Sequence, residues 1–384
     1  MKGIRIVPLA LALAFPARAD DGLSATEILT PRSGFRIESA RLRFTHFDQD
    51  GHGYQSLADR PTPLDPGRET LDVEQIQAEV IARHGKFTHR LWVPVDVVTA
   101  ASPDALDAVS SASRLNVAST ADLSTTYQTS STSELTVRGG AHLEEPFRSW
   151  LFGVGGARSF ADGNTTVAAS SNQALDWFDV FLLDGERVGR RFRSSTNANL
   201  SVTQLLSPTT VGLVGYGGTL QLGELTNGWN AVPLADGTVG IEQLPKLRHR
   251  HALVGRLAQA LPWHGIAKGA YRFYLDNWGI LGHTAEGQLY QRLGRHFYLR
   301  GSYRYDGQTA ARYFNLSAPP GERVFRTADS DLDIFRAHTF GLQAAVEIDL
   351  PGDQILHFDL GYEHFTRNND LHANVYSCSS AVRF

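Results

Sequence analysis

The chain has 384 residues and a nearly balanced charge, with 36 lysines and arginines against 40 aspartates and glutamates. This balance argues against a nucleic-acid partner, which would select a basic surface. The single cysteine, Cys378, excludes an internal disulfide and argues against cysteine redox chemistry. Stability must therefore come from hydrogen bonding and burial.

The N-terminus has the three parts of a secretory signal peptide. Lys2 and Arg5 precede an apolar run over residues 6–15, and Ala17-Arg18-Ala19 follows as a cleavage site. We predict a signal peptide over residues 1–19 and cleavage before Asp20. No later stretch approaches the roughly 20 consecutive apolar residues that a membrane helix needs. No linker divides residues 20–384, so we expect one domain.

Apolar and polar residues alternate with a period of two along much of the mature chain. Phe87 and Leu91, for example, share one face of a predicted strand, while Arg90 and Asp96 share the other. In the second half such segments follow one another, separated by short turns. The last segment alternates up to a terminal aromatic residue, Phe384, which is typical of the strand that outer-membrane assembly machinery recognises.

The pattern predicts an all-β fold, a closed antiparallel transmembrane β-barrel. Unsatisfied backbone groups cost several kcal/mol each in hydrocarbon, so a membrane-spanning sheet must close on itself. Residues 140–189 alternate poorly, so 14 strands is an alternative to 16. The 16 predicted strands begin at residues 35, 70, 86, 114, 132, 148, 164, 190, 209, 247, 266, 280, 297, 332, 354 and 371.

Long connections are expected on the side opposite the short turns, which matches short periplasmic turns and long outer loops. The second of them is rich in Ala, Ser, Asp and Val, and two placements are open for it: a constriction inside the lumen or a surface loop. The long connections are predicted over residues 48–69, 99–113, 173–189, 223–246 and 315–331.

The sequence also resembles a family of Gram-negative outer-membrane barrels known as a domain of unknown function. The resemblance covers most of the mature chain and is clearest over residues 197–314. It implies an outer-membrane barrel and supplies no activity and no catalytic residues. The matching segments are Val109-Ser110-Ser111-Ala112-Ser113, Gln204-Leu205-Leu206-Ser207-Pro208, Glu242-Gln243-Leu244-Pro245 with Arg248 and Arg250, Tyr271-Arg272-Phe273-Tyr274-Leu275-Asp276-Asn277-Trp278-Gly279, and Tyr303-Arg304-Tyr305 with Ala311-Arg312-Tyr313-Phe314.

Strand parity places many ionisable side chains in the predicted lumen. Cations come from the eighth to thirteenth predicted strands and acids from the next two. Facing cationic and acidic walls would favour small polar or anionic solutes, as in a porin-like channel. Alternatively, the charges neutralise one another in a closed lumen. The candidates are Arg191, Arg193, Arg248, Arg250, Arg256, Lys268, Arg272, Arg292, Arg300, Arg304, Glu347, Asp359 and Glu363.

Two weaker patterns suggest other chemistry. Asp48, Asp50, His52 and Asp59 have part of the spacing of a calcium-binding loop, but His52 and Asp59 depart from the usual residues and the segment lies between strands. An ordinary outer loop is the alternative. We predict no metal and no cofactor.

His357 and Asp359 share the predicted lumen face, and His283 and His338 lie near strand ends. This arrangement suggests testing for an outer-membrane hydrolase, although no motif supplies a serine nucleophile. We therefore expect no enzyme. The sequence predicts a barrel in the outer membrane of a Gram-negative bacterium that acts as a channel or transporter, or else as a scaffold with a closed lumen. The expected partners are membrane lipid, a small solute and the assembly machinery, which would bind through Phe384.

Overall fold

The structure is a computed structural model that describes residues 34–51, 70–101, 116–181, 186–226, 231–321 and 324–384. The predicted signal peptide lies outside these residues. Among the residues described, no helix is both long and apolar enough to cross a membrane.

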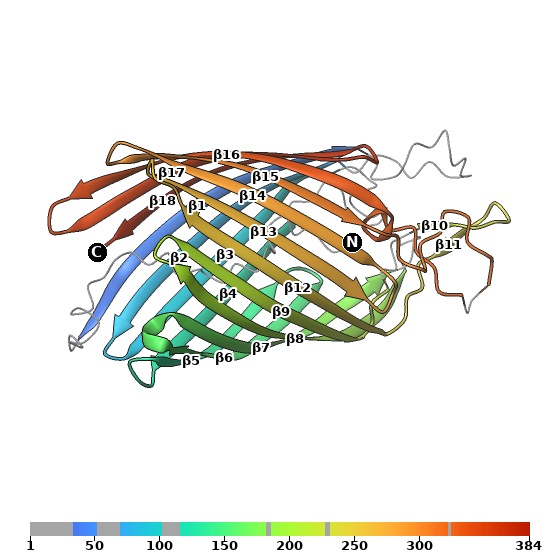
Figure 1. The fold of residues 1–384 in the computed structure, drawn as a ribbon. Helices are drawn as coiled ribbons and strands as arrows, with labels where there is room; N and C mark the ends of the chain where they lie inside the picture. The colour runs from blue at the N-terminus through green and yellow to red at the C-terminus, as the bar shows by residue number, and fades with distance from the viewer. Residues whose placement is uncertain (1–33, 52–69, 102–115, 182–185, 227–230, 322–323) are drawn as a thin grey trace.

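Sixteen antiparallel strands form a closed barrel (Figure 1). Each strand pairs with the next along the chain, except that β9 pairs with β12 because β10 and β11 form a separate two-stranded sheet. The first and last strands close the barrel, with Ser39 opposite Arg383 and Gly51 opposite Leu371. The strands are β1 (Phe35–Gly51), β2 (Leu71–His84), β3 (Phe87–Ala101), β4 (Asn116–Gln128), β5 (Ser133–Leu143), β6 (Phe147–Phe160), β7 (Thr165–Phe181), β8 (Arg187–Ser207), β9 (Thr210–Gly223), β10 (Ala231–Pro233), β11 (Val239–Ile241), β12 (Leu247–Ala260), β13 (Gly265–Asp276), β14 (Leu281–Leu293), β15 (Phe297–Gln308), β16 (Phe335–Leu350), β17 (Gln354–Arg367) and β18 (Leu371–Arg383).

Residues that alternate along each strand lie in turn on the outside and on the inside of the barrel. On β16, Phe340 and Leu342 are 54% and 60% exposed, whereas Thr339 and Ala345 on the other face are 8% and 2% exposed. A folded chain with large apolar residues exposed on most strands has an outer surface suited to hydrocarbon. We call the outer face lipid-facing and the inner face lumen-facing.

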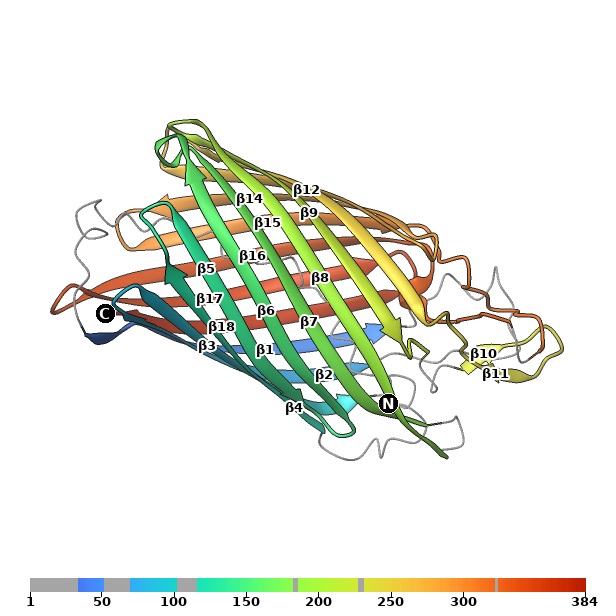
Figure 2. The same ribbon diagram turned by 90° about the horizontal axis from the view of Figure 1, so that it is seen from below.

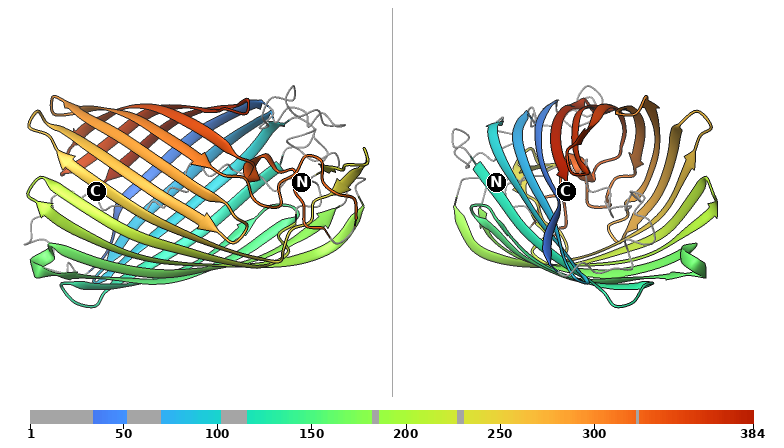
Figure 3. Two further views of the ribbon diagram at one scale, coloured as in Figure 1. Left: turned by 45° about the vertical axis from the view of Figure 1, so that its right-hand side comes forward. Right: turned by 90° about the vertical axis from the view of Figure 1, so that its left-hand side faces the viewer.

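The two ends of the barrel differ in their connections (Figures 1 and 2). One end, which we call the turn end, joins strands by tight turns that contain glycines with positive φ, such as Gly85, Gly294 and Gly352. The C-terminus lies at this end (Figure 3). The opposite end, the loop end, carries the longer connections. This asymmetry agrees with the sequence prediction.

The prediction of 16 strands is confirmed, and the alternative of 14 is wrong. Residues 140–189 alternate weakly because the lumen face of β6 carries Gly153 and Gly155, while Gln173 on β7 and Ser194 on β8 hydrogen-bond to each other on the lipid face. Polarity therefore fails to mark the two faces there, although the strands are present.

One predicted long connection, residues 173–189, is wrong. β7 continues to Phe181 and β8 begins at Arg187, so only residues 182–186 separate them. Cross-strand contacts extend the pairing: Asp176 bonds to Arg193, and Asp179 accepts from Arg187 at 2.7 Å. β1 and β3 also run into the predicted connections 48–69 and 99–113, whose remaining residues lie outside the described part.

Two of the predicted connections pack together at the loop end and form what we call the loop cap, the described residues of 224–246 and 309–334. Trp278, in the β13–β14 turn, is 2% exposed and packs with Leu244, Ala311 and Leu332. A second small core contains Val232, with β10 and β11 in the same connection. The cap is thus a folded unit beyond the barrel rim (Figure 1).

Candidate functional site

The lumen is the candidate site, because strand parity places the predicted ionisable residues there. On β12, for example, Leu253 and Leu257 are exposed on the lipid face at 55% and 48%, so Arg250 and Arg256 lie on the lumen face. The same alternation on the other strands places inside Arg191, Arg193, Arg248, Lys268, Arg272, Arg292, Arg300, Arg304, Glu347, Asp359 and Glu363.

Many of these cations lie beside an acid on their own strand, on a nearby strand or in the loop cap. The pairs do not face each other across a wide lumen; they lie along the wall. Local pairing reduces the field that two separated walls would produce. The pairs are Arg191–Glu224 at 3.9 Å, Arg193–Asp176 at 2.8 Å, Arg248–Asp276 at 2.6 Å, Arg292–Glu347 at 3.4 Å, Arg300–Glu363 at 3.5 Å and Arg304–Asp306 at 2.9 Å.

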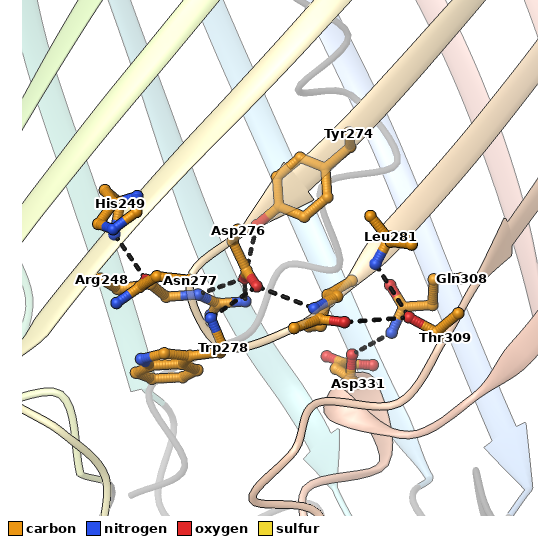
Figure 4. Close-up of polar contacts among 12 residues, drawn as sticks. Arg248, His249, Tyr274, Asp276, Asn277, Trp278, Leu281, Gln308, Thr309 and Asp331 are labelled. Carbon is orange, nitrogen blue, oxygen red and sulfur yellow. Dashed lines mark hydrogen bonds and ion pairs between the residues drawn. The ribbon is translucent and has the colours of Figure 1, made fainter.

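Asp276, the last residue of β13, organises the most buried of these pairs (Figure 4). Its Oδ2 accepts from Arg248 Nε and Nη2 at 2.9 and 2.6 Å and from the Tyr274 hydroxyl at 3.0 Å. Its Oδ1 accepts from the backbone N–H groups of Trp278 and Ile280, both at 3.0 Å. The Arg248 guanidinium also lies over the Trp278 ring, 4.1 Å from its centroid. One carboxylate therefore fixes the turn, the arginine and the base of the loop cap.

Arg250 and Arg272 differ from Arg248, because no acid of the described residues lies within ion-pair distance of either. Arg250 is within electrostatic range of Arg248 and Arg193 as well as Asp276, and its Nε is buried without a hydrogen-bond partner among the residues described. Arg272 lies over the Tyr274 ring at 5.1 Å. A guanidinium keeps its charge whether it is exposed, like Arg272, or partly buried, like Arg250, so both positions attract anions.

Lys268 completes this side of the lumen. Its ammonium lies 4.4 Å from the centroid of the Tyr290 ring, and no described acid is within ion-pair distance of it. Cation–π contact leaves the positive charge uncompensated. Arg256 has a partner of its own and does not belong to this set.

The sequence prediction missed two lumen cations on β1, Arg41 and Arg43. Leu42 and Phe44 are 57% and 41% exposed on the lipid face, which places both arginines inside. Both arginines are themselves exposed, and neither has an ion-pair partner among the described residues. The alternation of β1 was the signal that could have found them.

Further around the barrel, on β17, Asp359 is the centre of a polar cluster. It lies 3.3 Å from His357 Nε2, accepts from Gln343 at 2.7 Å and accepts from the Ser379 hydroxyl. Ser379 is bound to the acid and not to the histidine, so the order of a serine hydrolase triad is absent from this cluster. His283 and His338, the other candidates, contact tyrosines on the lipid face.

The calcium-loop pattern is only partly described. Asp48 and Asp50 lie in β1, where Asp50 accepts from Thr70 at 3.2 Å, while His52 and Asp59 are outside the described residues. Within the part of the chain that the structure describes, no group of three or more His, Cys, Asp or Glu side chains could hold a metal ion.

Fold and lumen together define a closed 16-strand β-barrel that is apolar outside and ionisable inside. A family model described as protein of unknown function (DUF3570) matches residues 95–376. The chain belongs to this family.

Among solved structures, the chain is similar to a bacterial polysaccharide outer membrane secretin, with 10% identity over 90% of this chain and 98% of that one and a TM-score of 0.48. It is similar to a BenF-like porin from Pseudomonas fluorescens Pf-5, with 8% identity, 90% and 99% coverage and a TM-score of 0.46. OccK9 (OpdG) of Pseudomonas aeruginosa gives 11% identity, 91% and 98% coverage and a TM-score of 0.45. No curated protein matches the chain in sequence.

Proposed function

We propose that the chain is an outer-membrane barrel whose lumen binds or passes small anionic solutes. One observation carries the proposal: the arginines Arg41, Arg43, Arg250 and Arg272 face the lumen without an acidic partner among the described residues. Their positive charge is not used within the wall, so it is available to a solute.

The outer face of the barrel and the closure of its sheet support a location in the outer membrane. Exposed leucine and aromatic side chains on the outer face suit hydrocarbon, and a closed sheet leaves no free strand edge there. The loop end would then face outward and the turn end the periplasm. The bound solute would carry a carboxylate, phosphate or sulfate, the groups that guanidinium binds best.

The test is conductance and ion preference in planar lipid bilayers. We expect the purified barrel to conduct with a preference for chloride over potassium, and the double variant Arg250→Gln/Arg272→Gln to lower that preference. The matched control is Arg158→Gln, because Arg158 is exposed on the lipid face near the turn end, over Phe160. An unchanged reversal potential in the double variant would contradict the proposal.

The local ion pairs favour a second candidate, a closed-lumen scaffold whose folded loop cap binds a partner. This candidate predicts no conductance and the recovery of a partner that depends on the cap. Neither candidate includes a reaction. We propose that the chain is not an enzyme, so His357→Ala should leave any lipid or peptide turnover in the preparation unchanged.

Export and assembly complete the proposal. Phe384 follows β18 at the turn end, where its N–H donates to the Glu38 carbonyl at 3.0 Å. We propose that this terminal aromatic residue is read by the assembly machinery after removal of the signal peptide. Deleting Phe384 should lower the amount of barrel inserted in outer-membrane fractions.

A further inference from the structure

Three pairs of tyrosine and histidine recur on the lipid face. The Tyr hydroxyl and His Nδ1 are 2.6 Å apart in Tyr216–His251, 2.5 Å in Tyr271–His283 and 2.8 Å in Tyr303–His338. The pairs join β9 to β12, β13 to β14 and β15 to β16, which are three successive pairs of neighbouring strands in the barrel. We call these six residues the Tyr–His row.

The geometry of the three pairs is the same. In strand register, Tyr216 lies opposite Leu253, Tyr271 opposite Ala285 and Tyr303 opposite Phe340. Each histidine is therefore two residues nearer the loop end than the residue opposite the tyrosine. The same diagonal contact on three strand pairs holds each histidine ring with Nδ1 toward the tyrosine hydroxyl.

The contact couples the tautomer of the histidine to the direction of the phenol hydrogen bond. When the phenol donates to Nδ1, the proton of the neutral imidazole lies on Nε2. Among the residues that the structure describes, none hydrogen-bonds to Nε2 of His251, His283 or His338, and these histidines lie on the lipid face near the loop end. With all three phenols donating, the row has three Nε2–H donors, and successive histidines are two strands, about 10 Å, apart.

The neighbouring surface indicates what these donors meet. Toward the turn end, the same strands expose apolar residues such as Leu253, Leu289 and Leu342 to hydrocarbon. A donor at the loop-end side of this apolar surface meets the polar headgroups of membrane lipids. The strongest acceptor in a headgroup is a phosphate, because an ionised acceptor shortens and strengthens the hydrogen bond.

We propose that the Tyr–His row binds the phosphate groups of lipids in the leaflet at the loop end. Each tyrosine is a positioning residue that holds its histidine as the Nε2–H donor. The site is independent of the lumen, so conductance and lipid binding can fail separately.

The experiment is native mass spectrometry of the barrel with phosphatidic acid and with diacylglycerol of the same acyl chains. These two lipids differ only in the phosphate. We expect the wild type to retain phosphatidic acid in preference, and His251→Phe/His283→Phe/His338→Phe to reduce that preference about ten-fold. Phenylalanine keeps the aromatic ring on the lipid face and removes the donor.

A second triple variant, Tyr216→Phe/Tyr271→Phe/Tyr303→Phe, keeps every histidine and removes the group that fixes its tautomer. A smaller loss of preference is expected. The control is His89→Phe: His89 is also lipid-facing and bonded through Nδ1 to a hydroxyl, that of Thr125 at 3.0 Å, but it stands alone at the turn end. Equal preference in the wild type and the His triple variant, both folded by circular dichroism, would overturn the proposal, as would an equal loss in His89→Phe.

Discussion

Arg248 and Arg250 are two residues apart on the same face of the same strand, and yet their surroundings are opposite. Arg248 has a side chain 10% exposed, an ion pair with Asp276 and a stacked tryptophan, whereas Arg250 has no acid at ion-pair distance among the described residues. Arg248 therefore stabilises the wall at the loop end. The charge of Arg250 remains available, and we place the solute beside Arg250.

Among the variants considered, Asp276→Ala should have the largest effect on stability. The variant leaves the buried Arg248 guanidinium and two turn N–H groups without their acceptor. Removing one partner of a buried ion pair costs about 3–5 kcal/mol in free energy of unfolding. Urea unfolding of the barrel in lipid vesicles, followed by tryptophan fluorescence, measures this loss. Asp276→Asn should lose less, because one amide oxygen can still accept from the turn.

If Asp276→Ala unfolds at the same urea concentration as the wild type, the Asp276 network does not stabilise the loop end. The separation of structural from available arginines would then lose its basis.

Gly223, at the loop end of β9, has a backbone conformation and surroundings that disfavour a side chain. Its φ is +113°, and a Cβ would overlap the carbonyl oxygen of Phe192. Gly223→Ala should cost about 1–3 kcal/mol in free energy of unfolding. The control is Gly255→Ala on β12, where a Cβ would meet nothing within 4 Å. Equal urea midpoints for the two variants would contradict this expectation.

Arg250→Gln tests the opposite expectation, that this arginine contributes little to stability. Because no acid is left without a partner, the free energy of unfolding should change by less than about 1 kcal/mol, while ion preference changes. The same urea titration and bilayer recording measure both quantities. A loss as large as that of Asp276→Ala would show that Arg250 is structural, and the channel proposal would lose one of its residues.

How far could the sequence predict this arrangement? Strand parity assigns each charge to a face of its strand, because it depends only on odd and even positions. It could not predict their partners. Arg300 on β15 reaches Glu363 on β17 across the intervening strand, where Gly341 has no side chain to separate them. That contact depends on register and on a missing side chain two strands away, which periodicity does not encode.

The diagonal Tyr–His contacts illustrate the same limit on the lipid face. Aromatic residues near strand ends can be recognised in the sequence, and they are typical of the membrane interface. The pairing of Tyr303 with His338, however, needs the β15–β16 register, in which His338 lies opposite Tyr305. Sequence patterns thus assign faces, and register assigns partners.

The smallest expected effect belongs to the ion pair at the turn end, Arg292 with Glu347. The atoms Nη2 and Oε2 are 3.4 Å apart, and the side chains are 55% and 40% exposed. Water screens such a pair, so Arg292→Ala should change the free energy of unfolding by about 0–1 kcal/mol, and less at high salt. The measurement is the urea midpoint at low and high salt. A salt-independent loss of several kcal/mol would mean that the turn end holds its charges as tightly as the loop end does, and that burial does not distinguish the two ends of the lumen.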